Sequence, residues 1–117
     1  MGIKYGNRKT QCRQSHFHDS KKEASYCDEL EIRKRAKDIL DYEVSPTFEL
    51  QPKFTNSQGE KIRAITYTPD FIVYYEGFNE IIDVKGGKVT QTQAWVLKWK
   101  WLQYHMREQH LARFTIV

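Results

Sequence analysis

The segment EIIDVKGG, residues 80–87, places a carboxylate and an amine two positions apart at the end of an apolar run. Alternate side chains of a strand point to opposite faces, so Asp83 and Lys85 share one face and Val84 lies on the other. An acid and a base presented side by side can bind a cation and orient a reactant. A solvated face at the end of an amphipathic strand has the same alternation, so both interpretations stay open at this point.

The preceding predicted strand supplies another carboxylate to the same face. The segment IRAITYTPDFIVYY, residues 62–75, is rich in β-branched and aromatic residues, and EGFN, residues 76–79, predicts a hairpin turn. A turn centred on the glycine and phenylalanine of EGFN pairs Asp70 with Lys85, whereas a turn centred on its first two residues pairs Asp70 with Asp83. In both registers the three side chains share one face of neighbouring strands, with Cβ atoms about 4.5 to 8 Å apart.

A proline beside Asp70 indicates that a site can open there. Pro69 cannot donate to a strand ladder and so marks an irregularity at which side chains are re-aimed. Two carboxylates that meet repel each other, and a shared proton or a divalent cation relieves the repulsion. Oxygen ligands suit Mg²⁺ or Mn²⁺, and a neighbouring lysine can orient a water molecule or offset charge on a phosphoryl transition state.

The rest of the chain predicts the elements that must position these residues. Ser20, followed three residues later by Glu23, has the spacing of a helix capping box. The apolar periodicity predicts helices over 20–40 and 91–110, an edge or irregular strand over 43–54, and a last strand over 112–117. This αβββαβ order predicts one α/β domain over residues 20–117, with a central mixed sheet flanked by helices.

The charge distribution favours a polyanionic partner. Nineteen Lys and Arg against fifteen Asp and Glu give a net charge of +4. Residues 1–19 lack an apolar period and are expected to form a flexible basic arm that lies on phosphates, although a merely solvated terminus has the same composition. The residues expected to contact nucleic acid are Lys9, Arg13, Lys21, Lys22, Lys88 and Lys98.

Two cysteines and two histidines near the N-terminus lack a familiar metal-binding spacing. Cys12 and Cys27 form no CxxC motif, so they are interpreted as buried or free structural thiols. His16 and His18 form an HxH pair that can chelate a metal, but without a further Cys or His nearby a zinc site is not expected. Both histidines are instead assigned to the basic arm.

The second predicted helix has two apolar stripes on nearly opposite sides. One stripe contains Trp95, Trp99, Leu102 and Met106, and the other contains Leu97, Trp101 and Tyr104. One stripe should pack on the sheet. The second can cover more core, form a homodimer interface or stack on splayed bases, and these alternatives stay open.

The spacing of the polar residues resembles a nuclease signature. Thr68-Pro69-Asp70, followed after twelve residues by Asp83-Val84-Lys85, looks like the PD-(D/E)xK motif of the restriction-endonuclease-like nucleases, whose core has a similar αβββαβ order. The segments DSKKEA, LQPKF, ITYTPDFIVYY and DVKGGKV resemble more closely a group of small phage-encoded proteins, long grouped as a domain of unknown function and thought to belong to that class. The resemblance covers roughly residues 20–117.

This resemblance implies a role for each residue of the motif. Asp70 and Asp83 would be ligands of Mg²⁺, with Mn²⁺ able to substitute, and the Val84 carbonyl would be a further ligand. Lys85 would position the attacking water.

Many such nucleases take another carboxylate from the first helix. Glu23 is the candidate, with a role as capping-box partner of Ser20 as the alternative, and Glu31 is a weaker substitute. Gln91 and Gln93 follow the motif at positions where related enzymes place a polar helper, or they only begin the second helix.

These observations together lead us to expect a Mg²⁺-dependent DNA endonuclease of phage origin. Contacts to phosphates without reading of bases favour a structure-selective enzyme acting on branched or recombination DNA, in the manner of a Holliday-junction resolvase. The alternatives are a non-catalytic DNA-binding module that recruits partners in phage replication or packaging, and an RNA-directed nuclease. Because the sequence has no apolar run long enough to span a membrane and no charged-then-apolar leader, a cytoplasmic location is expected.

Overall fold

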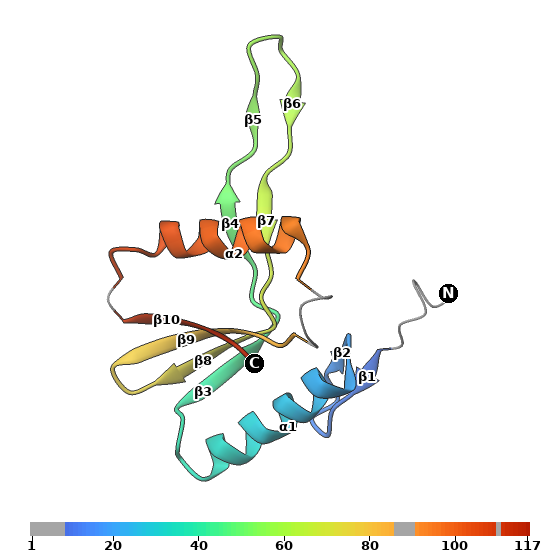
Figure 1. Cartoon of the computed structure of the whole chain (residues 1–117), viewed down its shortest axis with the longest axis vertical. Helices are drawn as coiled ribbons and strands as arrows, with labels where there is room; N and C mark the ends of the chain where they lie inside the picture. Colours follow the sequence, from blue (N-terminus) through green and yellow to red (C-terminus); the bar gives the residue numbers. More distant parts are fainter. Residues whose placement is uncertain (1–8, 86–90, 110) are drawn as a thin grey trace.

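A four-stranded mixed sheet lies between two helices, α1 and α2 (Figure 1). The computed structural model describes residues 9–85, 91–109 and 111–117. The strands follow the spatial order β10-β9-β8-β3, with bounds Ala112–Ile116, Phe78–Asp83, Phe71–Tyr75 and Asp41–Val44. β9 and β10 are parallel, and the other neighbouring pairs are antiparallel. The predicted mixed sheet flanked by helices is confirmed.

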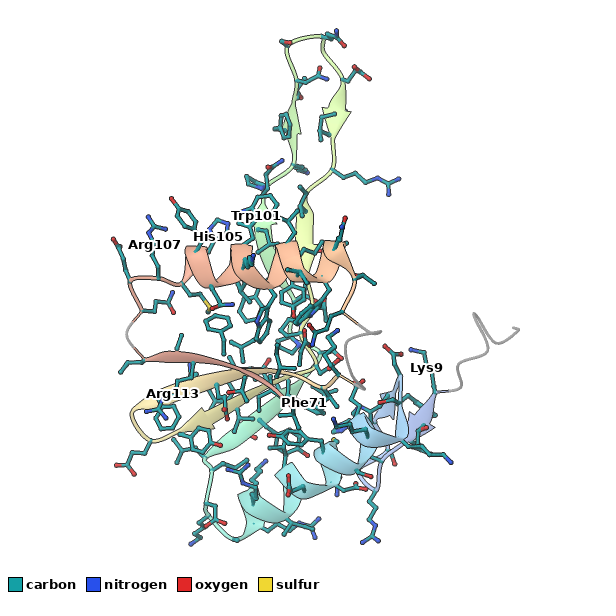
Figure 2. The ribbon with its side chains drawn as sticks, viewed as in Figure 1. Lys9, Phe71, Trp101, His105, Arg107 and Arg113 are labelled. Carbon is teal, nitrogen blue, oxygen red and sulfur yellow. The ribbon has the colours of Figure 1, made fainter. Side chains whose placement is uncertain are left out.

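Both faces of this sheet are buried, which explains the nearly continuous apolar character of β8. Phe71 and Val73 point to the face covered by α1 (Lys21–Arg35), and Ile72 points to the opposite face, covered by α2 (Gln93–His105). Figure 2 shows Phe71 between the sheet and α1. Because side chains alternate along a strand, each half of the core receives every second residue.

The first helix is shorter than predicted. Ser20 is its N-cap and accepts a hydrogen bond from the Glu23 backbone N–H, as predicted. The helix ends at Arg35, and Lys37 then adopts a left-handed φ of 65°. A non-glycine residue in this conformation ends the helix, so the prediction of a helix to residue 40 is wrong in its last turn. Ile39, included in the predicted apolar period, is buried outside the helix.

A long hairpin leaves the sheet and projects beyond α2 (Figure 1). It contains β4 (Phe48–Gln51) paired with β7 (Ile65–Tyr67), and β5 (Phe54–Thr55) paired with β6 (Lys61–Ile62). The predicted strand over 62–75 is interrupted at Pro69, as predicted, between β7 and β8. It is also divided between β6 and β7, which was not predicted. The predicted strand over 43–54 contributes only its beginning, β3, to the edge of the main sheet.

The N-terminal segment folds against α1. β1 (Thr10–Gln11) pairs with β2 (Phe17–His18), and Cys12 and His18 are buried. The expectation of a flexible arm therefore fails for residues 10–18, because two buried side chains fix this hairpin to the helix. Residues 1–8 lie outside the described ranges, and the boundary at residue 19 stays a prediction.

The two apolar stripes of α2 have different environments. Trp99 and Leu102 are buried, and Trp95 and Met106 pack against the same core, as predicted for one stripe. Leu97 and Tyr104, from the other stripe, are about three-fifths exposed. Figure 2 shows Trp101 and His105 on the side of α2 that faces away from the sheet. In the parts of the chain that the structure describes, no helix is long and apolar enough to cross a membrane.

Candidate active site

The hairpin register places Asp70 opposite Asp83. Tyr75 pairs with Phe78, so the turn is centred on Glu76 and Gly77, where Gly77 has a φ of 90°. This is the second of the two predicted registers. Asp83 contacts Trp95 of α2, and the Asp70 backbone N–H donates to Asp83, so the predicted clustering of the two aspartates is confirmed.

Asp83 is buried at the end of β9 and is held by three donors. Its Oδ1 accepts a hydrogen bond of 2.8 Å from the Asp70 backbone N–H. Its Oδ2 accepts hydrogen bonds from the Tyr67 hydroxyl and the Trp95 Nε1–H. The side chain is 2% exposed. These donors stabilise the carboxylate and fix its orientation, as preorganised ligands require.

Asp70 is bound to the next strand by its own carboxylate. Its Oδ2 accepts a hydrogen bond of 2.7 Å from the Val84 backbone N–H. Burial raises the pKa of Asp70 to about 7; the Val84 hydrogen bond and Lys85 oppose this shift, and the charges of Glu23 and Asp83 add to it. A divalent cation would reverse this effect by favouring the ionised form.

Glu23, in the first turn of α1, lies close enough to Asp70 for its charge to raise the pKa of that aspartate. It is 6% exposed, and its Oε1 accepts a hydrogen bond of 3.1 Å from His18 Nδ1–H. Burial raises the pKa of Glu23, and the His18 hydrogen bond opposes that rise. Only half of the predicted capping box forms, because the Glu23 backbone binds Ser20 while its carboxylate binds His18. We call Glu23, Asp70 and Asp83 the acidic cluster.

Lys85 lies beside the acidic cluster on the α2 side. Its Nζ is 4.5 Å from the centre of the Trp95 ring, whose Nε1–H binds Asp83. Its carbonyl accepts a hydrogen bond of 3.0 Å from Lys22 Nζ. The strand alternation predicted from Asp83 and Lys85 is therefore confirmed, and the Trp95 ring holds the ammonium near the carboxylates by a cation–π contact.

The oxygen atoms that remain can hold a hard cation. A carboxylate has about four acceptor sites. In the described part of the chain, hydrogen bonds to Asp70 engage only Oδ2, and Asp83 Oδ1 accepts a single one. Carboxylate and carbonyl oxygens are the ligands of Mg²⁺ and Mn²⁺. These donors are therefore of the chemical type that either ion takes, with Asp70, Asp83, Glu23 and the Val84 carbonyl as candidate ligands. Among the described residues, the acidic ones do not form a group with ligand atoms close enough together to hold an ion.

Glu31 is not part of this cluster. It accepts hydrogen bonds from the Tyr42 hydroxyl and from Arg35, two turns further along α1. Gln93 is exposed at the first residue of α2, where Thr92 is the N-cap. Gln91 and Gln93 instead line a cavity of about 300 Å³ with Val96, Leu97 and Lys100.

The basic residues predicted to bind nucleic acid differ in their contacts and exposure. Lys22 contacts the Lys85 carbonyl, but Lys9 pairs with Asp19 at 3.1 Å. Lys21 and Arg13 are exposed, and Lys98 is half-buried on α2. Lys88 lies outside the described residues, so its placement is not tested. Of these residues, Lys22 is therefore the one that an observed contact links to the acidic cluster.

A second cluster, which was not predicted from the sequence, contacts Glu23 through His18. One ligand atom from each of Cys12, His16, His18 and Cys27 lies within 4.8 Å of the other three. We call these residues the Cys–His cluster. The expectation that no further Cys or His lies near the HxH pair is wrong, because the β1–β2 hairpin and α1 bring both cysteines to it. The signal available in the sequence was the concentration of all four residues within 16 positions.

The comparisons with known proteins give a family and no function. No curated protein and no solved structure matches the chain. The family model described as "Protein of unknown function (DUF1064)" matches residues 2–116, nearly the whole length. The chain belongs to this family, DUF1064.

Proposed function

We propose that the protein is a Mg²⁺-dependent nuclease that hydrolyses phosphodiester bonds in DNA. The observation that carries the proposal is the convergence of Asp70, Asp83 and Glu23 beside the Lys85 ammonium at one end of the sheet. The TPD and DVK segments supply three of these residues, in the order of a PD-(D/E)xK motif. The sheet order β10-β9-β8-β3 with one helix on each face supports a restriction-endonuclease-like core as the finer fold.

The chain's own groups have distinct tasks in this reaction. Asp70 and Asp83, with Glu23, would bind the cation, which supplies charge stabilisation to the phosphoryl group when bound. The Lys85 ammonium would donate a hydrogen bond to the attacking water and orient it toward phosphorus. The hydrogen bonds from Tyr67 and Trp95 would keep the Asp83 carboxylate fixed in position.

The charge distribution supports a substrate that is bound through its backbone. Lys22 and Lys85 lie together at the acidic cluster, and Lys21 is exposed one residue from Lys22. Lysines that contact phosphates give affinity without reading bases. The proposal is therefore a structure-selective enzyme that acts on branched or recombination DNA in phage replication, recombination or packaging.

A cleavage panel tests this proposal. Linear duplex, single-stranded DNA, a flap, a four-way junction and a single-stranded RNA are incubated with the protein in Mg²⁺, Mn²⁺ or EDTA. We expect cutting of a branched DNA in either metal and none in EDTA. Asp83→Ala and Lys85→Ala should remove cutting, while Lys37→Ala, an exposed lysine beyond the end of α1, should retain it.

Two outcomes would contradict the proposal. Equal DNA binding in EDTA and Mg²⁺, with no cutting of any substrate, would favour a recruitment module. Cutting of RNA alone would assign the same chemistry to a different substrate.

Analytical ultracentrifugation with and without the junction tests whether the α2 stripe of Leu97, Trp101 and Tyr104 forms a homodimer on DNA.

A further inference from the structure

The Cys–His cluster has the composition and dimensions of a tetrahedral metal site. The Cys12 and Cys27 sulfurs are 3.4 Å apart, and His16 Nδ1 lies 3.3 Å from the Cys27 sulfur. In a tetrahedral zinc site, bond lengths of about 2.3 Å to sulfur and about 2.0 Å to nitrogen separate two sulfurs by about 3.8 Å and sulfur from nitrogen by about 3.5 Å. Small side-chain adjustments therefore open the observed cluster enough to admit the ion.

His18 supplies an independent indication of a ligand. Its side chain is fully buried, and Nδ1–H donates to the Glu23 carboxylate at 3.1 Å. Its other ring nitrogen, Nε2, has no hydrogen-bond partner among the described residues. A buried polar atom without a partner costs about 1 to 3 kcal/mol. With the proton fixed on Nδ1, the Nε2 lone pair is free to bind a cation, as in a carboxylate–histidine–zinc arrangement.

The short β1–β2 hairpin is a structure that a bound metal ion would stabilise. β1 and β2 each contain two residues, and the turn between them includes Ser15 with a left-handed φ of 67°. A two-stranded hairpin is marginally stable by itself in water. A metal that joined Cys12, His16 and His18 to Cys27 on α1 would close this hairpin onto the helix, because each of the two elements supplies ligands.

We propose that Cys12, His16, His18 and Cys27 bind one structural Zn²⁺. Loss of the two thiol protons to solvent leaves two thiolates, so the Zn(Cys)₂(His)₂ centre is neutral and suited to burial. Soft thiolate and imidazole ligands in tetrahedral geometry select Zn²⁺ over the hard cations that the acidic cluster would bind. The four protein ligands close the site to water, which makes it structural rather than catalytic.

This site also gives His18 a positioning function for Glu23. When Nε2 is bound to the ion, Nδ1 carries the remaining proton and must donate it, so the hydrogen bond to Glu23 is fixed. This part rests on the proposed nuclease function, since it treats Glu23 as a ligand of the second cation. The zinc site itself stands on its own contacts and does not depend on that function.

Metal analysis of the intact protein tests the proposal. The full chain is expressed with zinc in the medium, purified without an affinity tag under reducing conditions, and analysed by inductively coupled plasma mass spectrometry. We expect about one zinc per chain, set by the single four-ligand site. Cys12→Ser and Cys27→Ser should lose that zinc. Phe17→Ser is the matched control, because Phe17 lies between the two histidines but is 65% exposed, and this variant should retain it.

A spectroscopic measurement on the wild type covers the case in which a cysteine variant fails to fold. Chelator-treated, reduced protein is titrated with Co²⁺. Intense visible and thiolate-to-metal absorption that Zn²⁺ then displaces would support the site. No such absorption, zinc retained by both cysteine variants, or a Cys12–Cys27 disulfide that after reduction takes up no metal would overturn the proposal.

The same preparations separate this proposal from the nuclease. Asp70→Asn should keep about one zinc per chain, because it leaves all four zinc ligands intact. Zinc binding without DNA cleavage would support the zinc site and contradict the nuclease function. Cleavage without zinc would do the reverse.

Discussion

The acidic cluster and the Cys–His cluster are joined by the hydrogen bond between Glu23 of the first and His18 of the second, yet they are built from different kinds of secondary structure. The aspartates come from adjacent strands of a sheet whose faces are both buried. The Cys–His cluster depends on two strands of two residues each and on one helix. Backbone N–H groups of the sheet hold its carboxylates directly. In the hairpin, the proposed zinc ion would add to the contacts by which the buried Cys12 and His18 already fix it to α1.

The largest effect expected from this contrast is on cleavage by Asp70→Asn. The amide oxygen can still accept the Val84 hydrogen bond, so the strand pairing is kept while a charged ligand is removed. Loss of a cation's stabilisation of the transition state costs several kcal/mol, so the single-turnover cleavage rate in Mg²⁺ should fall about 10³-fold. Asp38→Asn, exposed beyond α1, is the control. A wild-type cleavage rate in Asp70→Asn would show that Asp70 does not bind the cation used in cleavage.

Glu23→Gln tests whether the two clusters are coupled. The amide can still accept from His18 Nδ1–H, but it no longer offers a charge to either cluster. Partners of ligating histidines alter metal affinity by about 10- to 100-fold, so competition with a chelator should show zinc held at least about tenfold more weakly. Cleavage should also decrease, by less than in Asp70→Asn. A variant that lost cleavage but bound zinc as tightly as wild type would show the clusters to be independent.

The sequence predicted the grouping of Asp70, Asp83 and Lys85 because the determinants of that grouping are local. Alternation along a strand placed Asp83 and Lys85 together, and the permissive Gly77 restricted the turn to two registers, both of which brought Asp70 to them. The choice between registers was not predictable, because a two-residue turn at either position has the same strand signals. The sequence also predicted that one apolar stripe of α2 packs on the sheet, and this stripe contains Trp99 and Leu102.

The Cys–His cluster was not predictable in the same way, because no periodicity specifies it. The hairpin is too short to show strand alternation, and its turn uses Ser15 where a glycine would have signalled a positive φ. The projecting hairpin was missed for a related reason. The alternation of Phe48 and Leu50 is that of any half-buried strand, and it does not say which strand is the partner.

Tyr67→Phe should show how far the sheet alone holds the acidic cluster. The Tyr67 hydroxyl donates to Asp83 in a buried setting, so its loss should lower the free energy of unfolding by about 1 to 2 kcal/mol. Urea denaturation measures this change. Tyr74→Phe, on β8 of the four-stranded sheet, is the control, because its hydroxyl donates to Glu43, which is exposed, and the change should be below about 0.5 kcal/mol. Equal changes in the free energy of unfolding for the two variants would show that the hydrogen bond to Asp83 contributes no more to stability than the exposed one to Glu43.

The smallest effect concerns Lys22, which links α1 to Lys85, two residues beyond the end of β9. Its Nζ donates to the Lys85 carbonyl from an exposed position, and such surface contacts contribute little to stability. Its charge should matter more for DNA, because each phosphate contact changes the slope of log affinity against log salt by about 0.9. Lys22→Ala should therefore leave the urea midpoint unchanged and reduce that slope by about one, measured by fluorescence anisotropy in Ca²⁺ to prevent cutting. Lys37→Ala should leave the slope unchanged. If both variants had the wild-type slope, Lys22 would not contact a phosphate. DNA would then bind away from the acidic cluster, which would leave both clusters with structural roles only.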